Sequence, residues 1–587
     1  MTAPRLDWLL PEPFLDPPTF EGFGRPVATL LARRGFRDDT GLRAFLEAGT
    51  GALHDLSRMA DADRALDRID AAIAAGQRIA IWGDYDADGM SAIAVWVLAL
   101  RALGVEPDRY VPSRIADGYG LSTAGLDELK ARGVDLVITC DCGVVNVAEV
   151  AHANGIGLDV IVTDHHLPGP ILPPAVAVVD PHRLDCAYPD PDLTGAGLAF
   201  KLAAALLARR GRSVPDLAAV AAIGTVSDMA PMTGESRAIV RLGLAELAIT
   251  ERAGLRALLA RGAEHPAAPT GRDLGFGIVP RINAAGRIAE AELAISLLVE
   301  EDPVAAERIA AALEAVHLQR REMTVAAVAE AHAIVAGSVG EGPLVVRSDG
   351  WAPGLIGLIA SRLVDALGRP VAVAALVGAE VRGSVRAPVD FHVAAALEAT
   401  SEHLTKRGGH AGAGGFSAAP EAWERFVAAF QALPRPWPAT EADVPAIPAG
   451  RVVIDLVLPA AHLGWELADE LDRLAPYGPG HVEPMLAVTG LRLAEARRVG
   501  ASGQHLALRM RRGLEVVDAI AFGVGPEAPL PEVGEAVDLV GTLERDAFQG
   551  LPRLRIRVID YADGAHSPLR GRRLAAVGPG VPAGATA

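Results

Sequence analysis

The chain has 587 residues, too many for a single hydrophobic core, so we expect several domains. Half of its residues are hydrophobic, but the longest apolar run, residues 92–100, is too short to cross a bilayer, so we expect no membrane association. The net charge of −18 argues against a generic basic nucleic-acid binder, although an acidic protein can still gather arginines on one surface.

Residues 1–75 begin rich in proline and continue with a helical pattern, so we expect an N-terminal helical segment there. Over residues 76–300, strands and helices alternate. Apolar, β-branched runs between helices are typical of a parallel sheet that helices cover on both faces. The expected strands are residues 78–82, 108–111, 134–140, 158–163 and 175–179.

The second half of the chain divides into five parts. Residues 301–337 show one long helical pattern that opens with acids and Pro303 and closes at Gly337. A smaller α/β unit is expected over residues 338–433, followed by a proline-rich linker over 434–449. Short alternating segments with glycine turns predict a small β-barrel over residues 450–563, and the remaining 564–587 are expected to be a disordered tail.

Cysteine usage points to a reducing compartment. Cys140, Cys142 and Cys186 are too few for a disulfide framework, and the N-terminus shows no secretory signal, so we expect a cytoplasmic protein. Cys140 and Cys142 flank Asp141 and could bind a metal. Without a second cysteine pair, a structural role is the better interpretation.

The stretch GDYDADG, residues 83–89, places three aspartates at alternate positions before a glycine. This spacing matches the first half of an EF-hand calcium loop. The loop also needs a bidentate glutamate at its twelfth position, which counted from Asp84 is Val95. The residues before Val95 are apolar and helix-forming, so we reject a calcium loop.

Acidic and imidazole side chains follow several of the expected strands. Since the carboxyl ends of parallel strands share one edge of a sheet, these side chains should meet in one crevice. A single aspartate at such a position can simply cap a helix, but several on separate strands favour a set of ligands. The residues are Asp84, Asp86 and Asp88 after the first strand, Asp141 after the third, Asp164, His165 and His166 after the fourth, and Asp228 after a later apolar run.

Such a ligand set suits particular metals. Carboxylates with imidazoles and no thiolate favour hard or borderline ions such as Mn²⁺ or Mg²⁺. Several aspartates in one pocket repel one another, and a pair of divalent ions would neutralise them. Two ions can clamp the attacking and leaving oxygens of a phosphoryl transfer, so the sequence predicts a two-metal site for that chemistry.

Four short motifs, in this order, resemble the DHH phosphoesterase family: GDYDADG, DCG at 141–143, DHH at 164–166 and SDM at 227–229. Longer stretches resemble the RecJ branch of that family, bacterial exonucleases specific for single strands. The resemblance covers about residues 55–560. The longer stretches are PSRIADGYGL (112–121), VPRINAAGR (279–287), GWAPGLIGLIASRL (350–363), GSVR (383–386), GGHAGAGGF (408–416) and LAPYGPGHVEP (474–484).

The resemblance implies a fold: an α/β protein with a parallel-sheet DHH domain and a smaller α/β DHHA1 domain joined by a long helix, followed by an OB-fold barrel. It also implies roles at the centre. Asp141 would lie between the two ions, His166 would face the scissile phosphate, Asp164 would orient the histidines, and Asp84 would be an outer ligand or shape the loop. The implied catalytic residues are Asp86, Asp88, Asp141, His165, His166 and Asp228, all of them metal ligands except His166.

Substrate contacts are implied in the same way. Arg114 would reach a phosphate near the 5′ end, Asn283 and Arg287 would line the channel, and the DHHA1 domain would bind the strand end. In the expected barrel, arginines alternate with apolar residues, so each run presents a basic stripe on one face of a strand. The DHHA1 residues are Ser384, Arg386, Gly408, Gly409 and His410; the barrel residues are Arg509, Arg511, Arg553, Arg555 and Arg557.

The resemblance implies a monomeric, metal-dependent 5′→3′ exonuclease that degrades single-stranded DNA to mononucleotides in DNA repair and recombination. Single-strand-binding protein and a helicase would be its partners. The alternatives are a small-substrate DHH phosphoesterase acting on oligonucleotides or dinucleotides, which would not need the barrel, and a non-catalytic module of the same fold. The intact motifs argue against the last. Strand polarity rests on the resemblance alone.

Overall fold

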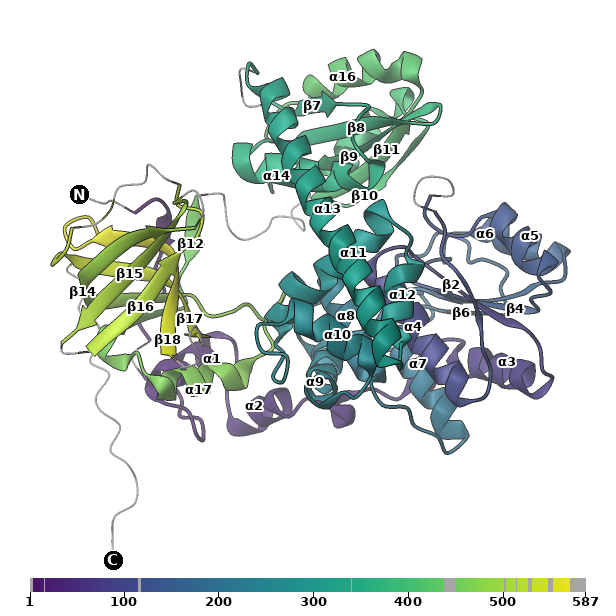
Figure 1. Ribbon diagram of the computed structural model, residues 1–587, viewed down its shortest axis with the longest axis horizontal. Helices are drawn as coiled ribbons and strands as arrows, with labels where there is room; N and C mark the ends of the chain where they lie inside the picture. The colour runs from purple at the N-terminus through teal and green to yellow at the C-terminus, as the bar shows by residue number, and fades with distance from the viewer. Residues whose placement is uncertain are drawn as a thin grey trace, which may run out of the picture. The chain divides into compact units, whose positions relative to one another are not determined.

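The computed structural model describes residues 4–14, 16–113, 118–338, 340, 342–437, 450–500, 503–513, 515–525, 530, 532–546 and 553–570. The chain forms two compact units. One comprises Ala48–Pro445 with Gly478–His481, and the other comprises Met1–Glu47, Ala446–Tyr477 and Val482–Ala587. Within the described ranges, no helix has the length and apolar character needed to span a membrane. Figure 1 labels the elements of both units.

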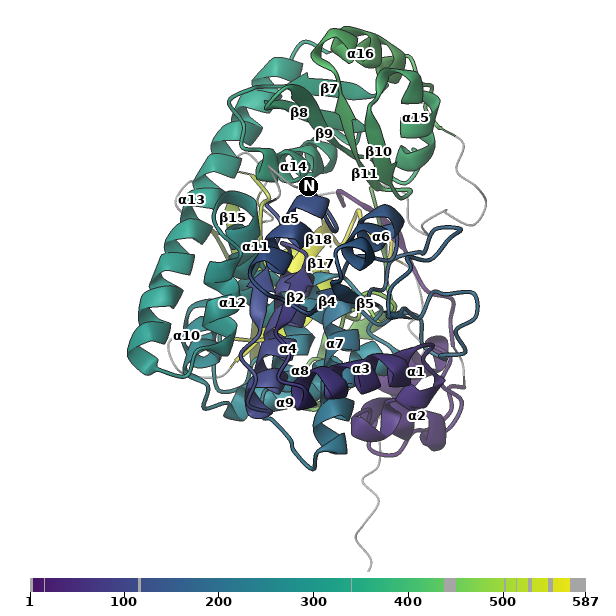
Figure 2. The same cartoon turned by 90° about the vertical axis from the view of Figure 1, so that its right-hand side faces the viewer.

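A parallel sheet forms the centre of the first unit. Its strand order is β3-β2-β4-β5-β6, and Figure 2 shows β2, β4 and β5 side by side. The expected strands are therefore confirmed with small changes at their ends. The strands are β2 (Ile79–Gly83), β3 (Asp108–Tyr110), β4 (Leu136–Cys140), β5 (Asp159–Thr163) and β6 (Ala177–Val179).

Helices cover both faces of this sheet because consecutive strand residues, which point to opposite faces, are mostly apolar. Ile79 and Ile81 face the cluster that includes α3 (Ala62–Ala74), α4 (Ala87–Ala102), α7 (Gly195–Arg209) and α8 (Leu217–Ser227). Ala80 and Trp82 face the opposite cluster with α5 (Thr123–Ala131) and α6 (Val147–Gly155). Every side chain of β2 is buried, which explains its continuous apolar sequence.

A helical layer continues the first unit. It contains α9 (Gly234–Ile249), α10 (Ala253–Gly262), a π-helical turn η3 (Asp273–Ile278), α11 (Val279–Ile288) and α12 (Glu292–Val299). The predicted long helix is α13 (Pro303–Val335). It begins at Pro303 because Asp302 caps it, accepting a 2.7 Å hydrogen bond from the Ala305 amide.

A second sheet follows α13, in the order β10-β11-β9-β8-β7. Only β7 and β8 pair in parallel; the other pairs are antiparallel. The sequence predicted β7 and β8 with the helix between them but not the three glycine-rich strands after them. The elements are β7 (Leu344–Arg347), α14 (Ile356–Leu367), β8 (Val371–Val377), β9 (Glu380–Arg386), α15 (Val393–Ala399), β10 (Lys406–Gly409), β11 (Ala413–Ala418) and α16 (Trp423–Gln431).

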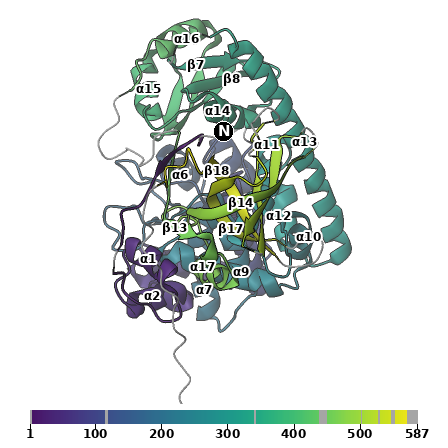
Figure 3. The same ribbon diagram turned by 90° about the vertical axis from the view of Figure 1, so that its left-hand side faces the viewer.

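The second unit is built around a β-barrel, part of which Figure 3 shows through β13, β14, β17 and β18. The strand order is β13-β14-β15-β16-β18-β17, and pairing of β14 with β17 closes the barrel, as predicted. The strands are β13 (Leu456–Pro459), β14 (Leu486–Val499), β15 (His505–Arg512), β16 (Glu515–Ala521), β17 (Ala536–Asp546) and β18 (Arg553–Asp563).

The structure divides the segment predicted as residues 1–75. Helix α3 packs on the parallel sheet, whereas β1 (Asp7–Leu9) pairs with β12 (Arg451–Val453) in the second unit. The apolar faces of α1 (Arg25–Arg33) and α2 (Asp39–Leu46) join the core of the barrel, beside α17 (Trp465–Leu474). These apolar faces, not proximity in sequence, decide where the N-terminal residues belong.

The prediction of a disordered tail is wrong for residues 564–570. Leu569 is buried in a cluster with Trp8, and the Ser567 hydroxyl donates a 2.6 Å hydrogen bond to Asp538. Residues 564–570 are therefore folded onto the barrel. The prediction for 571–587, and most of the predicted linker at 434–449, lies outside the described residues.

Candidate metal centre

The loop after β2 brings the first three aspartates to the start of α4. Asp86 caps this helix, accepting hydrogen bonds of 2.9 and 3.1 Å from the amides of Asp88 and Gly89. Gly89 is required here because a Cβ would lie 2.6 Å from backbone atoms of Asp84. Capping and metal binding are compatible, because the cap uses one carboxylate oxygen of Asp86.

Asp88 is buried at the meeting of α4 and α7. Its carboxylate accepts hydrogen bonds of 2.7 and 3.0 Å from the amides of Gly195 and Ala196, at the N-terminus of α7. Asp141 follows β4 and has a left-handed backbone, with φ 62°. A Cβ added at Gly195 would lie 2.5 Å from the Cβ of Asp141. Glycine at 195 thus allows Asp88 and Asp141 to meet α7 at one point.

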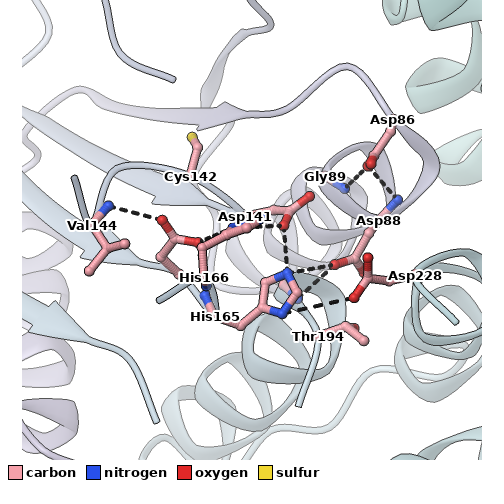
Figure 4. A network of polar contacts seen from close by, with 12 residues as sticks. Asp86, Asp88, Gly89, Asp141, Cys142, Val144, His165, His166, Thr194 and Asp228 are labelled. Carbon is pink, nitrogen blue, oxygen red and sulfur yellow. Dashed lines mark hydrogen bonds and ion pairs between the residues drawn. The ribbon is translucent and has the colours of Figure 1, made fainter. Parts of the chain in front are cut away.

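His165 lies among three carboxylates (Figure 4). Its Nε2 is 2.9 Å from an oxygen of Asp141 and 3.8 Å from one of Asp88, and its Nδ1 is 3.9 Å from one of Asp228. The predicted strand ends therefore do meet, together with the end of α8. Three overlapping groups have ligand atoms within 4.8 Å of one another: Asp141 with His165 and His166; Asp88 with His165 and Asp228; and Asp84 with Asp86 and Asp141.

Asp164 contacts both histidines. Its carboxylate accepts hydrogen bonds from the amides of Val144, His165 and His166, and lies 2.8 Å from Nδ1 of His166. Tyr119 was not predicted, yet its hydroxyl lies 3.0 Å from the same Nδ1 and donates a 3.1 Å hydrogen bond to the Asp141 carbonyl. Its place beside Arg114 in PSRIADGYGL was the only signal.

Burial sets the electrostatics of the carboxylates. It raises the pKa of Asp88 and of Asp141, and the neighbouring carboxylates raise both further. The pKa of Asp228 is raised to about 6, first by burial and then by Asp86. Among the described residues, only imidazoles lie within ion-pair distance of Asp88, Asp141 and Asp228.

The two histidines differ in charge. Burial, followed by repulsion from His166, lowers the pKa of His165 to about 4, so its imidazole is neutral at pH 7. Burial acts to lower the pKa of His166 as well, but its hydrogen bond and charge interaction with Asp164 outweigh this and raise it to about 9. A neutral imidazole suits a metal ligand, and a cationic one suits a phosphate.

The donor set fits divalent cations. In the described part of the chain these buried carboxylates have no lysine or arginine partner, so an external positive charge would stabilise them, and oxygen with imidazole donors suits Mn²⁺ or Mg²⁺. The thiols do not contribute: burial raises the pKa of Cys140 and of Cys142, and Figure 4 shows the Cys142 sulfur directed away from His165. A structural role for both cysteines is therefore the better interpretation.

Asn283 and Arg287 lie on α11 and have different partners. Asn283 accepts a 2.9 Å hydrogen bond from the Ala87 amide, so it fixes the loop that carries Asp86 and Asp88. Arg287 donates a 3.1 Å hydrogen bond to the Gly354 carbonyl, just before α14. The structure thus places Asn283 beside the metal centre and Arg287 where α11 meets the residues that precede α14. Arg114 lies outside the described residues.

Ser384 and Arg386 meet on β9. Arg386 donates a 2.9 Å hydrogen bond to the Ser384 hydroxyl and has no carboxylate partner in the described part of the chain; burial lowers its pKa. A Cβ at Gly357 of α14 would lie 3.3 Å from both side chains, so glycine leaves room there. Gly409 and the exposed His410 form the nearby β10–β11 turn.

The arginine stripe of the barrel exists but is mostly neutralised. Asp518, Glu544 and Asp546 lie opposite arginines on neighbouring strands and form ion pairs with them. Cross-strand carboxylates therefore balance the charge of these arginines, and their contact with a DNA backbone stays a prediction. Those paired are Arg509, Arg553, Arg555 and Arg557; Arg511 is exposed and has no ion-pair partner among the described residues.

Comparison with known proteins agrees with this architecture. Residues 78–225 match the DHH family N-terminal domain, residues 323–434 the DHHA1 domain and residues 454–560 the RecJ OB domain. Single-stranded-DNA-specific exonuclease RecJ of Bacillus subtilis is 34% identical over 93% of this chain and 69% of its own. RecJ of Escherichia coli is 33% identical over 90% of this chain and 94% of its own.

Solved structures give the same result. The crystal structure of RecJ in complex with Mn²⁺ from Thermus thermophilus has a TM-score of 0.77 and 30% identity, covering 95% of this chain and 80% of that one. The Mg²⁺ complex of the same protein has a TM-score of 0.72 and 28% identity, covering 95% and 78%. Since the match extends over all three domains and nearly the whole length, the chain belongs to the RecJ family.

Proposed function

We propose that this chain is a metal-dependent 5′→3′ exonuclease that degrades single-stranded DNA to mononucleotides, with a role in DNA repair and recombination. The observation that carries the proposal is the cluster of buried carboxylates around His165, with the cationic His166 at its edge. The relatives named as single-stranded-DNA-specific exonucleases support the choice of substrate. Single-strand-binding protein and a helicase stay predicted partners.

Two divalent ions, Mn²⁺ or Mg²⁺, would be held by Asp86, Asp88, Asp141, His165 and Asp228. When bound, such ions stabilise negative charge on the attacking and leaving oxygens of a phosphoryl transfer. Asp141 belongs to two of the candidate ligand groups, and so does His165. These two residues would therefore connect the ligands on the separate strands.

His166 would bind the scissile phosphate. Its proton is stabilised by Asp164, and Asp164 is in turn fixed by three backbone amides. The imidazolium would therefore be oriented before substrate arrives, which is how charged donors stabilise a developing oxyanion most effectively. Arg386 with Ser384 offers a second positive group, one with no ion-pair partner among the described carboxylates, and we assign it to the phosphate at the strand end.

The test is digestion of single-stranded DNA labelled at either the 5′ or the 3′ end, with Mn²⁺, Mg²⁺ or EDTA. Early release of the 5′ label as a mononucleotide, only with metal, is the expected result. Release of the 3′ label first would overturn the polarity. A higher kcat/KM for dinucleotides than for long strands would instead favour the small-substrate phosphoesterase. A blunt duplex serves as the control that should resist digestion.

A further inference from the structure

Phe276 is a large aromatic side chain that the fold leaves in solvent. It lies on the π-helical turn η3, which continues directly into α11, and 77% of its surface is accessible. Leu274 and Ile278 of the same turn are buried in the core of the DHH part. The turn therefore uses its other apolar residues for packing and presents Phe276 outward. π-helical turns are rare and occur frequently at functional sites.

Close backbone packing holds this turn in place. A Cβ at Gly277 would lie 1.7 Å from the carbonyl oxygen of Gly262 on α10, so only glycine allows the two backbones to meet. On the other side of Phe276, a Cβ added at Gly275 would lie 3.5 Å from the side chain of Val226 on α8. Because both flanking residues pack against helices, the ring of Phe276 is displayed from a fixed backbone.

Arg272 provides positive charge beside this ring. Its guanidinium carbon lies 5.2 Å from the ring centroid of Phe276, a cation–π contact. Arg272 is exposed, and no carboxylate within the described ranges forms an ion pair with it. An exposed aromatic face beside an uncompensated guanidinium is the combination that binds a base and its phosphate in single-strand-binding proteins.

The pair lies close to the metal centre. Phe276 precedes Asn283 by seven residues in a continuous helix, roughly 10 Å along the axis. Asn283 contacts the Ala87 amide between Asp86 and Asp88. Val226, beside Gly275, precedes the ligand candidate Asp228 by two residues. The contact through Asn283 and the contact through Val226 both indicate that Phe276 lies within a few nucleotides of a phosphate bound at the metal centre.

We propose that Phe276 and Arg272 form a stacking subsite for one base of the single strand, within a few nucleotides of the one that is cut. Single exposed apolar side chains are common on protein surfaces, and exposure alone would not support this. The support comes from the rigid display of the ring, the adjacent guanidinium and the short path to the metal centre. The inference rests on the proposed function and adds a base-contacting residue to it.

The test is binding of a 3′-fluorescein oligothymidylate to the full chain in EDTA, measured by fluorescence anisotropy, so that no strand is cut. Phe276→Ala and Phe276→Leu should each weaken binding roughly tenfold, within the range for one lost base stack. Phe276→Trp should retain wild-type affinity because it keeps an aromatic face. Ile249→Ala, at an equally exposed apolar position on α9, is the matched control and should leave affinity unchanged.

An abasic scan then identifies the base. Removing one base at a time should weaken wild-type binding, and at one position the difference between wild type and Phe276→Ala should vanish. If wild type binds the strand but Phe276→Leu binds equally well, the subsite is wrong while the proposed function stands. If wild type neither binds nor cuts single strands, the proposed function itself has failed. A loss of affinity that persists at every abasic position would also overturn the subsite.

Discussion

The hydroxyl of Tyr119 lies 3.0 Å from Nδ1 of His166, the same nitrogen that lies 2.8 Å from the Asp164 carboxylate. Burial raises the pKa of Tyr119, so the phenol stays protonated, and its hydroxyl donates a hydrogen bond to the Asp141 carbonyl. One phenol thus connects the backbone at the central aspartate with the cationic histidine. With Nδ1 held by two partners, Nε2 is the nitrogen of His166 left for a substrate.

Tyr119→Phe should lower kcat roughly tenfold and leave Mn²⁺ affinity unchanged, because loss of a supporting hydrogen bond misorients His166 without removing a ligand. The ring contact with His166 is kept in this variant. Steady-state kinetics and Mn²⁺ titration provide the two measurements. Tyr188→Phe removes a hydroxyl that donates to Glu235 in the same domain, and it should reduce stability without changing kcat. Equal effects of both variants on kcat would refute the role given to Tyr119.

Asp141→Asn should abolish cleavage and Mn²⁺ binding while leaving the fold intact. The amide keeps the shape of the side chain but removes the charge that two ligand groups share. Mn²⁺ binding can be followed by electron paramagnetic resonance, and the fold by circular dichroism. Asp185→Asn, at an exposed acid paired with Arg183, is the control. Full activity of Asp141→Asn in buffer freed of metal would rule out the proposed mechanism.

Strand order explains why so much of the centre could be predicted. Asp141, His165 and the aspartates near Asp86 all follow apolar strands, and parallel pairing of β2, β4 and β5 brings such positions together. Tyr119 could not be found this way because it lies in a loop between β3 and α5. Its partners are set by tertiary packing, which leaves no periodic signal in the sequence.

In the barrel, less of the arrangement could be predicted from the sequence. Alternation correctly predicted that its arginines share strand faces, but their charge balance depends on register between strands distant in sequence. Asp518 lies opposite Arg555 in one pairing and opposite Arg509 in another. Likewise, the pairing of β1 with β12 joins residues near the N-terminus to residues 451–453, far away in the sequence. Contacts of this range depend on the closed sheet, not on a local pattern.

Asp180→Asn should stabilise the metal-free protein more at pH 8.5 than at pH 5. The Asp180 side chain is fully buried, and burial raises its pKa to about 7. A carboxyl group whose pKa is raised in the fold contributes stability at low pH, which is lost as pH rises from about 4 through 7. Asparagine does not titrate, so its difference from wild type should grow by about 3 kcal/mol over that window.

Calorimetry in EDTA at several pH values measures this difference. The Asn oxygen can keep the 2.7 Å hydrogen bond from the His182 amide, so the comparison isolates the charge. Asp185→Asn, at an exposed position, should show no such pH-dependent gain. A difference between Asp180→Asn and wild type that stays constant with pH would show that Asp180 does not titrate in this range.

Arg511 and Arg555 should respond differently to the same substitution. Arg555 forms ion pairs with Glu544 and Asp546, and the side chain of Asp546 is buried. Arg555→Ala removes the arginine that both carboxylates share, so that Asp546 is left with Arg553 and Glu544 with Arg557 among the described residues. The loss of these charge-assisted contacts should destabilise the barrel by about 2 kcal/mol. Arg511→Ala should leave stability unchanged and weaken single-strand binding. The slope of the logarithm of affinity against the logarithm of salt concentration should become shallower by about one released ion.

Thermal unfolding and anisotropy at a series of salt concentrations distinguish the two variants. Arg511→Lys serves as the charge-conserving control and should keep the wild-type salt slope. The contrast follows from the structure alone, since both arginines lie in stripes that look alike in the sequence. If Arg555→Ala reduced the salt slope without loss of stability, its ion pairs would have to open when the strand binds. The barrel would then present the basic wall that the alternating arginines first suggested.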